Sequence, residues 1–301
     1  MNGIAHFLFF GNYFYGFCAV ALSIEASLQQ HTHLNSLAYY FLIFTATVLY
    51  YTRAYIAEPV SAKMNKISVW YVDNRKTIIR LQTLQTILLI ALCIYWLIFY
   101  WSHIIHLNLL QIELFFLFPI VAALYYGSVG PNGVTHNLRN NGWLKPFVIG
   151  FVWAGAVTVY PVLFNSLENN RPYLSDYVNI LLYIKNFMYI SMLCILFDIK
   201  DYAADHNRRL KTFVVRIGLR NTLFYILIPL SIIGLGTFML YALLHHFSFL
   251  RMLINTVPFI LLIIVAYSMH RRKSILYYLA IIDGLMLVKA VCGIIGILLF
   301  K

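Results

Sequence analysis

Three aspartates, Asp198, Asp201 and Asp205, stand at positions i, i+3 and i+7 of one short stretch. They are three of only ten acidic residues in a chain of 301. If the apolar helix before them continues through this stretch, the spacing places all three carboxylates on one helical face. Such a face can hold Mg²⁺, which takes one or two protein carboxylates together with substrate phosphates. The spacing alone is equally typical of a solvated acidic turn at a membrane boundary.

Basic residues accompany and follow the aspartates. They are Lys200, Arg208, Arg209, Lys211, Arg216 and Arg220. The first four stand close enough in sequence to neutralise the charge that develops on a leaving diphosphate. The mixture of acids and bases therefore favours a site for a cation and a phosphorylated substrate.

The composition places these residues in a membrane protein. Hydrophobic residues make up 62% of the chain and charged residues 11%, against about half and about a quarter in soluble domains. One soluble core cannot bury that excess, because a large surface still needs polar cover. We therefore predict an all-α integral membrane protein, a bundle of about nine transmembrane helices forming a single domain over residues 1 to 301.

Nine apolar segments are long enough to cross a bilayer. They cover approximately residues 3 to 24, 37 to 57, 78 to 101, 107 to 127, 146 to 165, 177 to 198, 221 to 244, 252 to 269 and 275 to 299. The first lacks a basic leading region and a convincing cleavage site, so we interpret it as a retained helix.

Loop charges predict the orientation of the bundle. Sixteen Lys and Arg residues fall in the loops after the second, fourth, sixth and eighth spans, and three fall on the opposite side. The positive-inside rule then makes the N-terminus and the aspartate stretch cytoplasmic and the C-terminus external. We expect a multi-pass protein of a bacterial inner, or plasma, membrane. The net charge of +12 also suits anionic lipid, whereas nucleic acid would need a soluble basic domain that is not predicted.

Ionisable residues within the spans are further candidates. Lys185, Asp283 and Lys289 lie at membrane depth, where charged groups are usually functional or paired. A structural ion pair of Asp283 with Lys185 or Lys289 is the alternative to a functional role. Glu25 is expected at the outer end of the first span, with its carboxylate in solvent.

Arg53 stands near the end of the second span, before the apolar run has finished. Its side chain either snorkels to the interface or binds an anion in a cytoplasmic cavity. The segment from Glu58 to Arg80 mixes aromatic and basic residues. That mixture suits a short interfacial helix over the cytoplasmic mouth of the bundle, or a plain connecting loop.

The stretch from Asp198 onward resembles the second aspartate-rich motif of the UbiA superfamily of membrane prenyltransferases. That motif reads D-x-x-x-D, often with an earlier acid, followed by K-T-x-x-V-x-x-G. Asp201 and Asp205 match the pair, and Asp198 matches the earlier acid. Lys211-Thr212 and Gly218 match the tail. The nine expected helices and the place of the motif after the sixth also resemble the family.

The resemblance implies a Mg²⁺-dependent transfer of a prenyl group from a prenyl diphosphate to a lipophilic acceptor in the membrane. Aromatic walls would shield the allylic carbocation, and the chain has 23 Tyr and 23 Phe residues to build them. The implied metal ligands are Asp198, Asp201 and Asp205. The implied catalytic residues are Asp201, Asp205, Lys211 and Arg53. The implied diphosphate ligands are Arg53, Lys200, Arg208 and Lys211.

The first motif of that family is missing. It reads N-x-x-x-D-x-x-x-D and should end the second helix, but residues 50 to 55 contain no acid and include Arg53. A guanidinium can bind diphosphate directly and so replace one metal ion. Alternatively, the protein has kept the fold without the chemistry and binds a lipid or quinone. A transporter or channel, using Asp283 or Lys185, is the third hypothesis.

Overall fold

The computed structural model describes residues 3–57, 66–129, 135–136, 138, 141–170, 177–207, 212–269 and 277–300. The helices are α1 (Gly3–Phe10), α2 (Tyr13–Gln29), α3 (Leu37–Ala57), α4 (Lys66–Asp73), α5 (Arg75–Phe99), α6 (Trp101–Ile104), α7 (Leu109–Tyr126), α8 (Lys145–Ala154), α9 (Tyr160–Asn169), α10 (Tyr177–Asn207), α11 (Phe213–Thr222), α12 (Ile228–Leu244), α13 (Phe249–Ser268) and α15 (Gly284–Leu299). Single π-helical turns, Gly155–Val159, Leu223–Leu227 and Tyr278–Ile282, lie between or before them. Two short strands, β1 (Ser128–Val129) and β2 (Thr135–His136), pair antiparallel.

The chain is an all-α membrane protein. Among the described residues, seven helical segments are long and apolar enough to cross a bilayer. α3 is not one of the seven, although it has 21 residues, because five tyrosines and three threonines lower its mean hydropathy. The total of nine membrane spans and the orientation of the chain in the membrane therefore stay predictions.

The first predicted span differs from the structure. α1 and α2 meet at an angle of 62° instead of forming one straight helix, and counted together they make an eighth candidate span. The break falls at Gly11 and Asn12, and Asn12 adopts a left-handed backbone conformation with φ of 62°. Asparagine tolerates this conformation better than most residues, and it interrupts the helical hydrogen-bond pattern.

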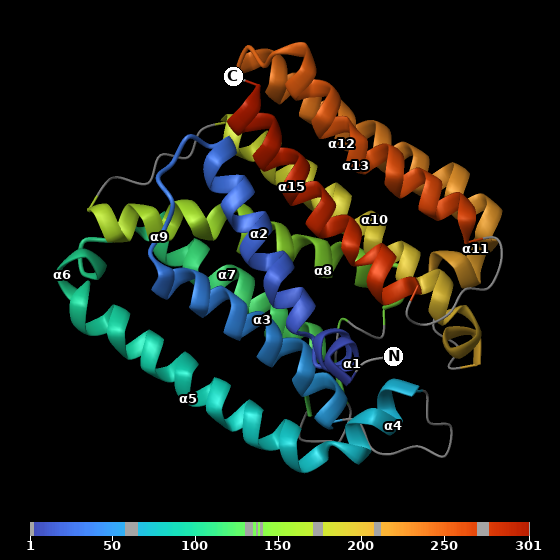
Figure 1. Cartoon of the computed structure of the whole chain (residues 1–301), viewed down its shortest axis with the longest axis horizontal. Coiled ribbons are helices and arrows are strands. Elements are labelled where there is room, and N and C mark those ends of the chain that lie inside the picture. The colour runs from blue at the N-terminus through green and yellow to red at the C-terminus, as the bar shows by residue number, and fades with distance from the viewer. Residues whose placement is uncertain are drawn as a thin grey trace.

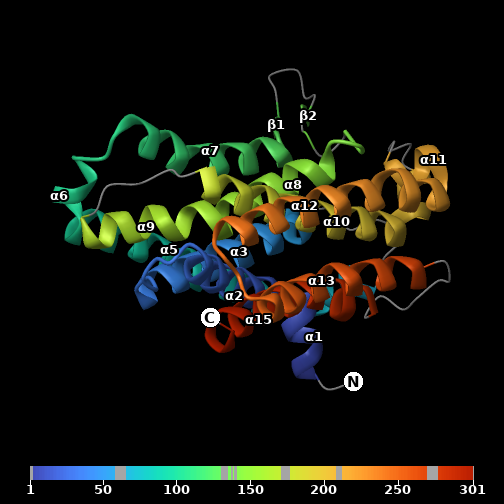
Figure 2. The ribbon, with the colours of Figure 1, turned by 90° about the horizontal axis from the view of Figure 1, so that it is seen from above.

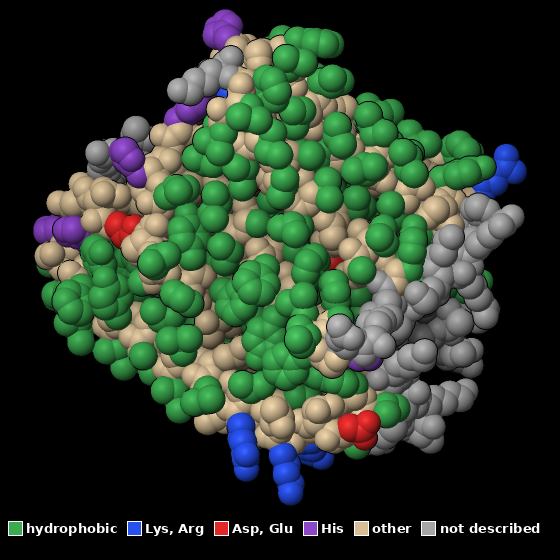
Figure 3. Space-filling view, in the orientation of Figure 1, with side chains coloured by type: hydrophobic (Ala, Val, Ile, Leu, Met, Phe, Trp, Pro, Cys, Tyr) green, Lys and Arg blue, Asp and Glu red, His purple; other side chains and the backbone are tan. Residues whose placement is uncertain are grey.

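Apolar side chains dominate the surface. Figure 3 shows a face covered by hydrophobic side chains, with Lys and Arg at its lower and right margins and His along the opposite edge. α5 illustrates the pattern, because Leu84, Ile98 and Phe99 are each more than 60% exposed. Lipid is the environment in which such a surface is stable.

α10 lies at the centre of the bundle. It packs along α8 and α12, while α2 packs on α3 and α15, and α13 packs on α15. Figures 1 and 2 show α10 crossing the interior of the bundle between these neighbours. Met192, Ile195 and Leu196 are fully buried on α10. Tertiary packing on several sides therefore fixes the helix that carries the aspartates.

The segment before α5 contains a short helix, as one of the two alternatives predicted. The Tyr71 hydroxyl of α4 donates to the Phe10 carbonyl oxygen at 2.9 Å and accepts from Asn12 Nδ2 at 3.0 Å. Burial raises the pKa of Tyr71, so the hydroxyl keeps its proton at neutral pH. These contacts attach α4 to the bend between α1 and α2.

The π-helical turn after α8 depends on a glycine. A Cβ atom added at Gly155 would overlap the buried ring of Phe118 on α7. We expect Gly155→Ala to lower the free energy of unfolding by about 1 to 3 kcal/mol through overpacking. Thermal unfolding in detergent measures this loss. Gly236→Ala on α12 is the matched control, because nothing lies within 4 Å of its added Cβ. Equal melting temperatures for the two variants would contradict the expectation.

Candidate functional site

The aspartate stretch is helical, as the spacing argument required. α10 continues without interruption to Asn207, so Asp198, Asp201 and Asp205 share one helical face. Of these, only the Asp198 side chain is among those described. Lys200 also lies on α10, and its side chain is likewise not among those described. Arg208 and Lys211 lie outside the described residues altogether.

Asp198 is completely buried and forms an ion pair with Lys145, with 2.7 Å between Nζ and Oδ1. Lys145 begins α8, and Pro146 occupies the first turn of that helix. A buried carboxylate is stable only when a partner compensates its charge. The sequence interpretation used Lys145 only as a topology signal, since 53 residues separate it from Asp198. One of the three predicted metal ligands thus already has a cation beside it.

The ion pair between Lys145 and Asp198 leads to a prediction about stability. We expect Lys145→Met to lower the free energy of unfolding by about 3 kcal/mol, because Asp198 then remains buried without this cation. Chemical denaturation of the purified protein measures the loss. Lys145→Met combined with Asp198→Asn should recover much of it, since no buried charge is left. An equally unstable double variant would show that packing by the lysine stem, rather than charge, causes the loss.

Aromatic side chains line the interior beside Asp198. We call Tyr15, Tyr51 and Trp153 the aromatic wall; they come from α2, α3 and α8. The rings of Tyr15 and Tyr51 stack with centroids 4.6 Å apart and planes at 15°. Trp153 Nε1 donates a hydrogen bond to the Tyr51 hydroxyl at 2.6 Å.

Cys194 connects the aromatic wall to the aspartate. It lies one turn before Asp198 on α10, and it is within electrostatic range of both the Tyr51 hydroxyl and the Asp198 carboxylate. Asp283, buried just before α15, lies close to the Tyr15 hydroxyl of the wall. The wall is therefore bounded by two buried carboxylates.

Arg53 lies on α3, two residues after Tyr51, and its side chain is exposed. Exposure agrees with the snorkelling alternative, and its contact with diphosphate stays a prediction. Its neighbour Thr52 is buried, accepting from Asn12 Nδ2 at 3.2 Å. The C-terminal part of α3 therefore offers hydroxyls and one guanidinium where the family motif would offer carboxylates.

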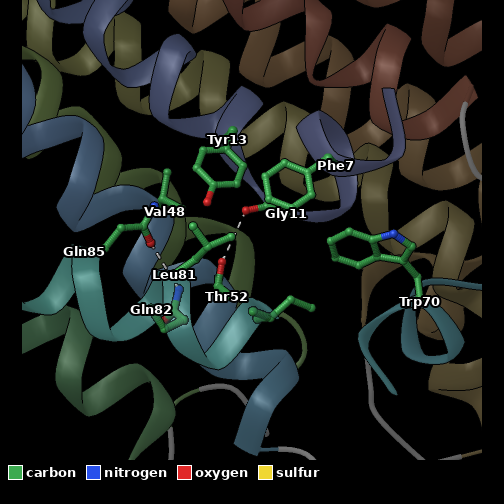
Figure 4. A pocket seen from close by; sticks show the side chains of 10 residues that line it. Phe7, Gly11, Tyr13, Val48, Thr52, Trp70, Leu81, Gln82 and Gln85 are labelled. Carbon is green, nitrogen blue, oxygen red and sulfur yellow. Dashed lines mark hydrogen bonds between the residues drawn. The ribbon is translucent and has the colours of Figure 1, made fainter. Parts of the chain in front are cut away.

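A small pocket opens between α1, α3, α4 and α5. Figure 4 shows it bounded by Phe7, Tyr13, Thr52, Trp70 and Gln85 together with Gly11, Val48, Leu81 and Gln82. Its cavity volume is about 10 Å³, roughly the room that one water molecule needs. Most of its lining is apolar, with hydroxyl and amide groups at a few points. A pocket of this volume is therefore too small to hold a lipid or a prenyl chain.

The environment of Glu25 differs from the one that the sequence predicted. Glu25 was expected in solvent, but its side chain is completely buried. Lys289 Nζ lies 2.7 Å from Glu25 Oε2, and Lys185 Nζ lies 3.5 Å from Oε1. The predicted alternative of pairing Asp283 with either lysine is therefore wrong. The physical reason is local: α2 continues to Gln29, and Gly293 on α15 leaves the space that Glu25 fills.

Asp201 and Asp205 stay the predicted Mg²⁺ ligands of α10, and their side chains are not among those described. Asp201 and Asp205 are one turn apart on a helix, and Mg²⁺ needs only one or two carboxylates when phosphate oxygens complete its shell. Asp198 fits less well, because Lys145 engages its Oδ1 atom. Among the described side chains, which do not include those of Asp201 and Asp205, no group of three His, Cys, Asp or Glu could hold a metal.

A solved structure resembles the whole chain. It is that of a digeranylgeranylglyceryl phosphate synthase in membranes, a prenyltransferase of the UbiA superfamily. The similarity covers 99% of both chains with a TM-score of 0.56 and 13% sequence identity. The chain therefore shares the overall fold of that synthase. No protein-family model and no curated protein matches the sequence. The resemblance drawn from the aspartate stretch is thus confirmed for the fold.

Proposed function

We propose that the protein transfers a prenyl group from a prenyl diphosphate to a lipophilic acceptor within the membrane. The observation that carries the proposal is the placement of the aspartate stretch. In a chain with the fold of a membrane prenyltransferase, Asp198, Asp201 and Asp205 share one face of the central helix α10.

The proposed reaction begins with ionisation of the allylic C–O bond. The bonding electrons leave with the diphosphate, and Lys200, Arg208 and Lys211 stabilise its negative charge. Mg²⁺ held by Asp201 and Asp205 would supply further positive charge to the same oxygens. Tyr15, Tyr51 and Trp153 present π-faces that stabilise the carbocation and exclude water. The acceptor nucleophile then bonds to the prenyl carbon and releases a proton.

A second function, non-catalytic binding of a lipid or quinone, is favoured by the distribution of charge around the site. α3 carries exposed Arg53 and no carboxylate along its whole length, Leu37–Ala57, and Asp198 is engaged by Lys145. Only one side of the site then carries metal-binding charge. In our proposal Arg53 replaces the missing metal by binding diphosphate oxygens with its planar fork.

Binding of prenyl diphosphate separates the two functions. Purified protein in lipid nanodiscs is titrated with geranyl, farnesyl and geranylgeranyl diphosphate and with the corresponding prenyl alcohols. Each titration is carried out once with Mg²⁺ and once with EDTA. The proposal expects at least one of them to bind more than tenfold tighter with Mg²⁺. Binding equal with and without Mg²⁺, or binding of the prenyl alcohol as tight as that of the diphosphate, would support the lipid-binding function.

A further inference from the structure

A second buried polar cluster lies away from the aspartate site. The Glu25 cluster consists of Glu25, Gln29, Lys185, Asn255 and Lys289, all of them at least 94% buried. It joins α2, α10, α13 and α15. Lys185 precedes Asp198 by 13 positions on α10, which is roughly 20 Å along a helix. The cluster is therefore separate from the aspartate stretch, and its chemistry is independent of prenyl transfer.

Hydrogen bonds connect the cluster to the first turns of α13. Gln29 Oε1 accepts from Lys185 Nζ at 3.0 Å, and Gln29 Nε2 donates to Asn255 Oδ1 at 3.3 Å. Asn255 Nδ2 in turn donates to the Arg251 carbonyl oxygen at 3.0 Å. Arg251 is itself only 6% exposed and lies within electrostatic range of Lys185.

The charges of this region do not balance. Lys185, Lys289 and Arg251 supply three positive charges, and Glu25 supplies one negative charge. Their formal charges sum to +2, and uncompensated charge in a low-dielectric interior is strongly unfavourable. Both lysines already contact the Glu25 carboxylate. The excess positive charge is thus associated with Arg251.

The donors of Arg251 show where an anion would bind. Its Nε and Nη2 atoms are buried and find no hydrogen-bond partner among the described residues. These two nitrogens carry the parallel N–H bonds of one guanidinium edge, which matches two oxygens of a carboxylate or phosphate. The guanidinium carbon lies 3.3 Å from the centroid of the Phe247 ring, so stacking holds this edge in a fixed plane.

Arg251 occupies the depth of lipid headgroups. It is the third residue of α13, which is long and apolar enough to span a membrane. The end of the bundle where α13 begins also holds the last turn of α15 (Figure 1), and Ser248 Oγ donates to the Phe300 carbonyl oxygen at 3.3 Å. The Arg251 edge therefore lies near the membrane boundary at this end, and neighbouring side chains must shift for an anion to reach its buried nitrogens.

We propose that Arg251 binds a phosphate oxyanion through its Nε–Nη2 edge, with the Glu25 cluster supplying the remaining positive charge. Phosphate, like carboxylate, presents two oxygens to the edge. It is the anion that lipid headgroups carry at this depth, and inorganic phosphate can bring a second negative charge. The phosphate belongs to an anionic lipid headgroup or is free in solution. Either source satisfies the same buried donors, and the experiment distinguishes them.

The test compares four proteins in detergent: wild type, Arg251→Gln, Arg251→Lys and Arg80→Gln. Native mass spectrometry follows binding of phosphatidylglycerol against phosphatidylcholine, and equilibrium dialysis follows radiolabelled inorganic phosphate. Arg80 is an exposed arginine on α5 and serves as the matched control. We expect Arg251→Gln to weaken binding at least tenfold, Arg251→Lys to weaken it less, and Arg80→Gln to bind as wild type does.

The two ligands distinguish the sources of the phosphate. Preferential binding of phosphatidylglycerol that inorganic phosphate does not displace identifies a lipid headgroup, and saturable binding of inorganic phosphate identifies a free anion. If wild type binds neither, the proposal is overturned, and proton loss from a lysine must remove the excess charge. If Arg251→Gln fails to fold, the binding measured for Arg251→Lys tests the proposal instead. Lysine keeps the positive charge but lacks the two parallel N–H groups of the guanidinium edge. Wild-type affinity in Arg251→Lys would then contradict binding by the guanidinium edge.

Discussion

Prenyl transfer by the Asp201→Asn and Asp205→Asn variants is expected to be about a thousandfold slower than transfer by the wild type. Each change keeps the size of the side chain and removes one of the charges that hold Mg²⁺ and the diphosphate. Loss of one preorganised electrostatic contact to a developing charge costs on the order of a hundredfold to a thousandfold in rate. The proposed single metal site has no carboxylate on α3 to compensate, so we expect the upper end of that range.

The measurement is kcat/KM for release of diphosphate in nanodiscs. Asp73→Asn provides the matched control, because Asp73 ends α4 with an exposed side chain. We expect the control to keep wild-type activity and all variants to unfold at the same temperature. Full activity in both Asp201→Asn and Asp205→Asn would remove the aspartate stretch from the mechanism.

Glu25→Ala is expected to destabilise the protein by about 3 to 5 kcal/mol, since removing one partner of a buried ion pair leaves the other charge uncompensated. Lys289 and Lys185 are 3% and 2% exposed, so neither ammonium group reaches solvent when the carboxylate is gone. Glu113→Ala is the matched control, because Glu113 is exposed on α7. Chemical denaturation of the purified protein should show the loss for Glu25→Ala only.

A double-mutant cycle separates charge from packing at Glu25. Lys289→Met removes the closer partner, 2.7 Å from the carboxylate. If the ion pair causes the instability, Glu25→Gln with Lys289→Met should be more stable than the sum of the two single changes predicts. Strict additivity would instead indicate that the side-chain volume beside Gly293 is what matters.

The local parts of the fold could be predicted from the sequence. Composition indicated a membrane helix bundle, and the spacing of Asp198, Asp201 and Asp205 required the helix that α10 provides. These features depend on periodicity and hydropathy, which a single chain shows directly. The bend at Asn12 was not predicted, because one residue with positive φ leaves no clear signal inside an apolar run.

The long-range contacts could not be predicted. Glu25 and Lys289 are 264 positions apart, and the glycine that makes room for their pair lies on α15. Glu25 therefore looked like an outer-end residue, although α2 continues one turn further than predicted. Lys145 was interpreted as a topogenic charge for the same reason, since its partner Asp198 lies on another helix. Side-chain pairing across a bundle depends on helix packing that no local pattern records.

Mass spectrometry of reaction products tests the proposed prenyl transfer most directly. The protein in nanodiscs is incubated with extracted membrane lipids, Mg²⁺ and geranylgeranyl diphosphate, and lipids and diphosphate are then quantified. Our account predicts a new lipid whose mass equals an acceptor plus one prenyl group, formed in step with the release of diphosphate and absent in Asp205→Asn. Geranylgeranyl diphosphate that binds but is recovered intact, with no prenylated lipid, would contradict it.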